Sequence, residues 1–60
     1  MAHVFVVKIE DQIGLHMVRV EEEERLEQVL ALYGVESGTW KLIENRADDD
    51  RIPLNCILSA

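Results

Sequence analysis

The residues best suited to chemistry are acidic side chains, and they gather in two short runs. The first run is Glu21 to Glu24, with Glu27 one helical turn later, and the second is Asp48 to Asp50. The whole chain carries 12 Asp and Glu against 6 Lys and Arg, a formal net charge of -6. Because contacts to phosphates need Lys and Arg, this balance argues against direct binding of nucleic acid. It suits attraction to a basic surface on another protein.

The two runs allow two interpretations. The simpler one is a solvated helix start, where carboxylates favour the positive end of the helix dipole. The more specific interpretation is that both runs form one anionic surface, which imitates DNA phosphates and occupies the basic channel of a partner protein. Duplex DNA carries one charge per about 1.7 Å of axis, so such a surface would associate fast and be salt-sensitive. The residues assigned to it are Glu21, Glu23, Glu24, Glu27, Asp48, Asp49 and Asp50, with Trp40 as an apolar anchor that slows dissociation.

The other reactive side chains lack the spacing that metal binding or catalysis requires. Consecutive aspartates diverge in a turn, and the spaced ligands of a calcium loop are missing around Asp48. His3, His16 and Cys56 show none of the close pairs typical of zinc sites. His16 is interpreted as a strand histidine with a satisfied hydrogen bond, and Cys56 as a small core residue. The chain is therefore predicted to be non-enzymatic, with no metal and no cofactor.

The length of the chain limits its architecture. Sixty residues make one domain, because a chain of about this size buries only about 60% of its unfolded surface and has no room for a second core. The longest uncharged apolar run, Val4 to Val7, is far too short to span a bilayer. No secretory leader opens the sequence, and one Cys cannot form an internal disulfide. These features predict a soluble cytoplasmic protein that does not bind membranes.

Hydrophobic periodicity predicts a single ββαββ domain of the α+β class. One helix is expected from Glu21 to Tyr33, because Leu26, Val29, Leu30 and Tyr33 recur at helical spacing. Gly34 is expected to end this helix in a Schellman arrangement that brings Val35 onto Leu30. Alternating segments predict four strands, at Ala2 to Glu10, Leu15 to Glu21, Thr39 to Asn45 and Ile52 to Ala60.

The arrangement of the strands is left open by the sequence. One candidate is a mainly antiparallel sheet in the order 2-1-3-4, which we favour, and the other is a β-grasp-like order 2-1-4-3. A single helix of about 20 Å covers only one face of such a sheet. The predicted core on the helix side consists of Phe5, Val7, Ile9, Val18 and Val20 with the helix residues Leu26, Val29, Leu30 and Tyr33.

Apolar residues are also predicted on the sheet face that the helix leaves open. Val4, Val6 and Met17 project to this side, accompanied by Leu15. A contiguous apolar patch on a small soluble protein often marks an interface. The open face is therefore a second candidate interface, through which the chain would form a homodimer or serve as a β-grasp-like accessory subunit of an assembly.

The stretch VRVEEEERLEQVLALYGV, followed by TWKLIE, resembles the very small inhibitor proteins of bacteriophages and mobile elements. These include anti-CRISPR proteins and phage inhibitors of host RNA polymerase. The resemblance implies a non-enzymatic protein that blocks a nucleic-acid machine in the bacterial cytoplasm by occupying its surface, often as a DNA mimic. A CRISPR–Cas complex is the first expected target. The likeness assigns no role to any single residue, because such inhibitors share no common motif.

Overall fold

The computed structural model describes all 60 residues, and its chain begins with a β-hairpin. Strands β1 (His3–Ile9) and β2 (Leu15–Val20) pair antiparallel, as the alternating sequence predicts. In the turn between them, the Gln12 amide donates to the Ile9 carbonyl at 3.1 Å. Gly14 closes the turn with a φ of +84°, a conformation that glycine adopts without steric cost.

Helix α1 (Glu24–Leu32) follows the hairpin and ends as predicted. Gly34 has a φ of +83°, and its amide donates to the Ala31 carbonyl at 3.0 Å. The Val35 amide donates to the Leu30 carbonyl at 3.0 Å, which completes the Schellman motif. No helix in the chain combines the length and the apolar character needed to cross a membrane.

The helix begins later than its hydrophobic pattern suggests. The prediction placed its start at Glu21, whereas the structure places Glu21 to Glu23 in a turn and begins α1 at Glu24. Glu23 occupies the N-cap position, but its side chain makes no capping hydrogen bond. With no Ser, Thr, Asp or Asn to accept from the first free amides, nothing anchors an earlier first turn.

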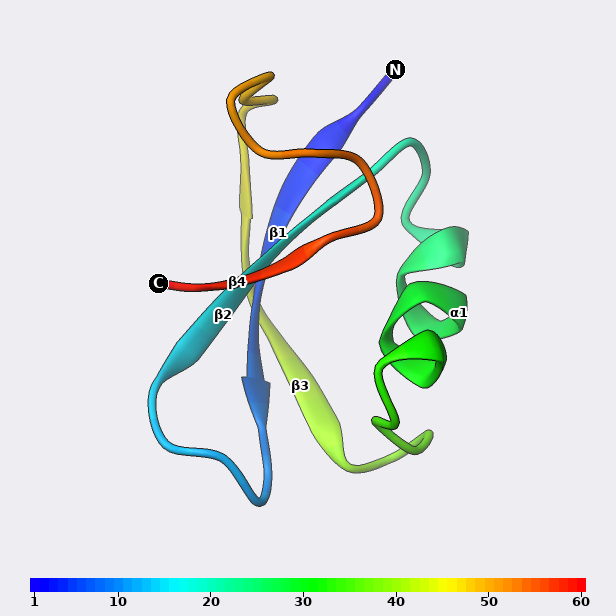
Figure 1. The fold of residues 1–60 in the computed structure, drawn as a ribbon, viewed down its shortest axis with the longest axis vertical. Coiled ribbons are helices and arrows are strands. Elements are labelled where there is room, and N and C mark those ends of the chain that lie inside the picture. Colours follow the sequence, from blue (N-terminus) through cyan, green and yellow to red (C-terminus); the bar gives the residue numbers. More distant parts are fainter.

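The predicted fold class is confirmed, but the position of the last strand is not. Strands β3 (Trp40–Arg46) and β4 (Ile57–Ser59) complete one open four-stranded antiparallel sheet in the order β3-β1-β2-β4 (Figure 1). Both orders considered from the sequence placed the last strand beside β3, and both are wrong. With β4 antiparallel to β2, the β-grasp pairing of the first and last strands is absent.

The cause of this order is the segment between β3 and β4, residues 47–56, which crosses one end of the sheet. It is held there by Arg19 of β2, whose guanidinium donates to the Ile52 carbonyl at 3.1 Å and whose carbonyl accepts from the Asn55 amide at 2.8 Å. Asn55 has a φ of +62°, which interrupts an extended chain. The strand predicted from Ile52 to Ala60 is therefore shortened to three residues.

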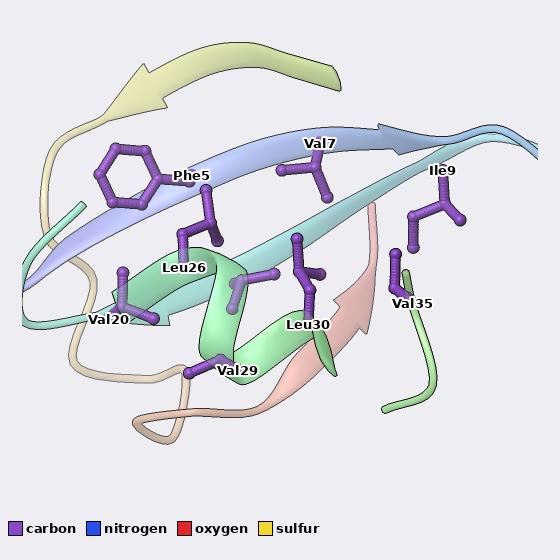
Figure 2. Packing of buried hydrophobic residues seen from close by; sticks show 9 residues of the cluster. Phe5, Val7, Ile9, Val20, Leu26, Val29, Leu30 and Val35 are labelled. Carbon is purple, nitrogen blue, oxygen red and sulfur yellow. The ribbon is translucent and has the colours of Figure 1, made fainter. Parts of the chain in front are cut away.

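The core lies between α1 and the sheet, where the periodicity places it. Figure 2 shows α1 side chains packed against residues of β1 and β2. Tyr33 is the exception, since it lies half exposed and its hydroxyl donates to the Asn55 carbonyl at 3.1 Å. Val35 joins the core in its place, delivered there by the Schellman turn. The buried cluster consists of Phe5, Val7, Ile9, Val18, Val20, Leu26, Val29, Leu30 and Val35, with Trp40 and Ile57 partly buried against it.

A β-bulge interrupts the pairing of β3 with β1. Val7 lies opposite Leu42 and Val6 opposite Glu44, so Ile43 is one extra residue without a partner in β1. The bulge shifts the alternation of β3 by one residue. As a result, Trp40, Leu42 and Asn45 share the helix side of the sheet with Ile9, Val7 and Phe5, whereas Lys41, Glu44 and Arg46 share the open side with Lys8, Val6 and Val4.

His16 departs from its interpretation as a satisfied strand histidine. It is 9% exposed, and its Nδ1 atom is buried without a hydrogen-bond partner. Leaving a buried polar atom unpaired costs roughly 1–3 kcal/mol.

We therefore expect His16→Leu to raise the free energy of unfolding by about 1 kcal/mol, measured by urea denaturation at neutral pH. His3→Leu is the control, since no atom of His3 is buried and unpaired; equal effects in both variants would show that added apolar surface, not the orphaned nitrogen, is responsible.

Candidate functional site

The two acidic runs lie at the same end of the sheet. Glu21 to Glu24 follow the last residue of β2, and Asp48 to Asp50 follow the end of β3. Both strands run antiparallel to β1, and the pairs His3–Val20 and Val4–Arg46 place both strand ends beside the start of β1. We call this region the acidic end; it consists of Glu21, Glu22, Glu23, Glu24, Glu27, Asp48, Asp49 and Asp50.

The glutamates of the acidic end are directed into solvent. Residues Glu21 to Glu24 and Glu27 are all exposed, and none of them forms an ion pair. Their place at the start of α1 is favourable, because the unpaired amides of the first turn carry partial positive charge. Four consecutive carboxylates without an ion-pair partner, next to the single cation Arg25, leave a negative field that a basic partner would neutralise.

The aspartates of the acidic end differ from the glutamates, because two of them already hold arginines. The Asp48 carboxylate accepts from Nε and Nη2 of Arg19 at 2.7 and 3.3 Å. Asp49 accepts from Nε and Nη2 of Arg51, both at 2.9 Å, and from the Arg51 amide at 3.1 Å. Asp50 alone in this run has no ion-pair partner. The second run thus contributes one free charge where the sequence suggested three.

These pairs set the protonation of the aspartates. The Arg19 guanidinium hydrogen-bonds the Asp48 carboxylate and lowers the pKa of Asp48, while the same bond raises the pKa of Arg19. The side-chain and backbone hydrogen bonds from Arg51 lower the pKa of Asp49. Both carboxylates therefore stay ionised to lower pH than in the unfolded chain.

We expect the Arg19–Asp48 pair to make stability fall in acid. Because the pKa of Asp48 is lower in the folded state than in the unfolded chain, its contribution is complete above about pH 4 and is lost as the pH falls through the folded pKa. Asp48→Asn should lower stability at pH 7 and flatten the fall of stability as the pH drops below about 4, as measured by urea denaturation at several pH values. Asp50→Asn, which removes an unpaired carboxylate, is the control; equal flattening in both variants would contradict this assignment.

Arg19 is the residue of this region that the sequence reasoning missed. It ties the segment 47–56 to β2 through its ion pair with Asp48 and its bond to the Ile52 carbonyl. Its only signal in the sequence is a charged residue between Val18 and Val20 in an apolar strand. A basic residue at that place implies a nearby acid, but the spacing of 29 residues to Asp48 gives no hint of which one.

Trp40 does not adjoin the acidic end, contrary to its predicted role as an anchor. It lies opposite Ile9, the last residue of β1, and it is partly buried against the core. The acidic end lies beyond the opposite end of β1, which at about 3.3 Å per residue is roughly 20 Å away. The apolar residue that does adjoin the acidic end is Leu54, which is 41% exposed and bridges to Arg19.

The open sheet face is largely covered by its own side chains. Val4 and Val6 are each 1% exposed, and Met17 is half-buried. Arg46 on β3 contacts the sulfur of Met17 on β2 at 3.7 Å, and β1 lies between these two strands. This contact therefore passes over the valines of β1. Of the predicted apolar patch, Val4 and Val6 are therefore buried and Met17 is half-buried, while Leu15 and Leu58 beside Met17 stay substantially exposed.

The remaining hollows and reactive groups are shallow or isolated. Two open hollows of about 360 and 420 Å³ lie where β3 begins, at the end of the sheet away from the acidic end. No group of three His, Cys, Asp or Glu side chains converges in a way that would hold a metal ion. Cys56 is half-buried, and the proximity of its thiol to the Tyr33 hydroxyl raises the pKa of Tyr33.

The chain was compared with protein-family models, with curated proteins and with solved structures. No match was found in any of the three comparisons. The candidate site accordingly rests on the geometry and charge of the acidic end.

Proposed function

We propose that this protein is a non-enzymatic inhibitor whose acidic end occupies the basic nucleic-acid-binding site of a partner protein. The observation that carries the proposal is the group of five exposed glutamates, Glu21 to Glu24 and Glu27, at one end of the sheet, none of which has an ion-pair partner. Only three of the 12 acids in the chain form ion pairs. The unpaired charges favour a partner rich in Lys and Arg.

Fewer residues are proposed to bind the partner than the sequence predicted. Asp48 holds the segment 47–56 to β2 through Arg19, and Asp49 pairs with Arg51 within the segment, so neither carboxylate is free for a partner. Asp50 adds one unpaired carboxylate at the same end of the sheet as the glutamates. Leu54, which is exposed and bridges to Arg19, supplies apolar contact at this end. Charge then provides fast encounter with the partner, and desolvation of Leu54 provides residence time.

The resemblance to small phage inhibitors supports a partner that handles nucleic acid in the bacterial cytoplasm. A CRISPR–Cas complex is the first candidate, and a host RNA polymerase is the second. In either case, inhibition is stoichiometric and requires no reaction. DNA or RNA and this protein would compete for one basic groove, because both present closely spaced negative charges.

Capture from bacterial lysate followed by competition tests the proposal. The immobilised protein should retain a nucleic-acid-processing protein at about 0.05 M NaCl and release it at about 0.5 M, since ionic contacts are screened by salt. The released protein should bind DNA or RNA less well as this chain is added. Binding that survives high salt, or a complex that takes up nucleic acid with unchanged affinity, would overturn the proposal.

A second function, as an accessory or assembly subunit, is favoured by the apolar residues still exposed on the open face. Leu15, two residues before the half-buried Met17 on β2, is 37% exposed, and Leu58, opposite Met17 on β4, is 40% exposed. This surface differs from the predicted one in that it excludes Val4 and Val6. Loss of association in a Leu58→Asp variant would support it.

A further inference from the structure

The first observation concerns β3, which forms one edge of the sheet. Its inner side pairs with β1, and its outer side has no partner strand. Every residue from Lys41 to Arg46 is exposed, over nearly the full length of the strand. The other edge, β4, has only three residues. An exposed edge of this length is a template for another strand, because its outward amides and carbonyls are unpaired within the sheet.

The second observation is an unrelieved positive charge on this edge. On the open face, Lys41 of β3 lies directly opposite Lys8 of β1, and like charges at such positions repel each other. Lys8 turns its ammonium to the Ile9 and Gln12 carbonyls, whereas Lys41 has no ion-pair partner. An acid on the outer side of β3, level with Lys41, would relieve this repulsion.

The third observation is that β3 carries such an acid itself, Glu44, whose carboxylate accepts from Arg46 Nε at 3.2 Å and has its second oxygen without an ion-pair partner. Antiparallel pairing with a second copy would bring this acid to Lys41. In the register that sets Leu42 opposite Ile43 of the other copy, Lys41 lies opposite Glu44, and the twofold axis repeats this pair. A regular strand forbids this register, because residues an odd number of positions apart point to opposite faces. The bulge at Ile43 removes this obstacle, since it places Lys41 and Glu44 on the same open face.

From these observations, we propose that β3 is a homodimer interface in which two copies pair edge to edge in this register and form one continuous sheet. The helix-side residues fit the same arrangement, because Trp40 then faces Asn45 of the second copy. Leu42 and Ile43, 40% and 52% exposed in the single chain, come together at the centre of the interface. The proposal concerns a surface separate from the acidic end and stands independently of the proposed function.

The size of this interface sets the strength of the dimer. Stable protein interfaces bury about 1,200–2,000 Å² in total, and one pair of short strands buries less. The bulge also disrupts ladder hydrogen bonds at the centre. The dimer is therefore weak and depends on concentration. Sedimentation equilibrium of the full chain from micromolar to millimolar concentration, at about 0.15 M NaCl to screen the repulsion of two acidic copies, should show reversible dimerisation.

A charge exchange across the twofold axis tests the register. Lys41→Glu places two acids opposite each other at both symmetric positions, and Glu44→Lys places two lysines there, so each single variant should dimerise at least tenfold more weakly. The double variant K41E/E44K restores opposite charges and should dimerise as the original chain does. Arg25→Glu and Glu36→Lys make the same charge changes at exposed residues outside β3 and should leave dimerisation unchanged.

Two results would overturn the proposal. A chain that stays monomeric at millimolar concentration would show that the bulge and the charges of β3 protect the edge against pairing. If K41E and E44K leave the dimerisation affinity unchanged, or if the double variant does not restore it, the copies associate through another surface. Dimerisation lost in Leu58→Asp but kept in both single variants would place the interface on the open face.

Discussion

Replacing Val6 with Asp is expected to unfold the protein. Val6 is 1% exposed, although it projects to the sheet face that the helix leaves open. A carboxylate at this place loses its water, and the nearest cation, the Arg46 guanidinium that reaches Met17, is already paired with Glu44. Burying a charge without full compensation costs roughly 3–5 kcal/mol. Since a domain of this size has roughly 3–5 kcal/mol of stability in total, circular dichroism should show loss of the folded state at 25 °C.

The matched control for this variant is Leu58→Asp. Leu58 lies on the same face in the edge strand β4 but is 40% exposed, so a carboxylate there stays hydrated. This variant should remain folded. The two variants distinguish an effect on folding from an effect on association. Only Leu58→Asp, which stays folded, can report on association through the open face. A folded and stable Val6→Asp variant would show that the Arg46–Met17 cover opens readily.

Neutralising Glu23, Glu24 and Glu27 together, each to Gln, is expected to weaken binding of the proposed partner by about tenfold or more at low salt. These three side chains are exposed and unpaired, so their substitution breaks no contact that holds the fold together. The weakening should appear mainly in the association rate and should shrink as salt is raised, because long-range attraction steers the encounter. Stopped-flow or surface-based kinetics at two salt concentrations measure both effects.

The control for this triple variant removes three charges from the opposite end of the molecule. Glu10, Asp11 and Glu36 line a hollow where β3 begins, and their combined substitution to amides gives the same net charge. This control should bind almost as the original chain does. If both triple variants weaken binding equally, only the total charge matters, and the acidic end has no special role.

The helical part of the fold was predictable because its signals are local. The spacing of Leu26, Val29 and Leu30 identifies the buried face of α1, and Gly34 identifies its end. The position of β4 depends on a contact between distant residues, namely Arg19 with the segment 47–56. No local pattern encodes that contact, so the strand order could not be derived from periodicity.

The sequence shows which acids make up the acidic end, but it does not show which of them lack an ion-pair partner. Two runs of acids are visible in the sequence, and antiparallel pairing places them at one end. Which acids are neutralised depends on where Arg19 and Arg51 point, and this is set by the tertiary fold. Alternation alone predicts which face Val4 and Val6 occupy, but not that Arg46 and Met17 cover them, because this contact too is set by the tertiary fold.

The path of the chain from β3 to β4 has a consequence for the order of folding. The pairings of β1 with β2 and of β1 with β3 lie entirely within residues 3–46, so we expect the hairpin, α1 and β3 to assemble before the later segment docks. The last strand must then travel across the end of a sheet that already exists and dock on its far edge, with only three residues of ladder to hold it. We therefore expect β4 to dock after the rate-limiting step and to open first, so that its amides exchange with solvent well before those of β1.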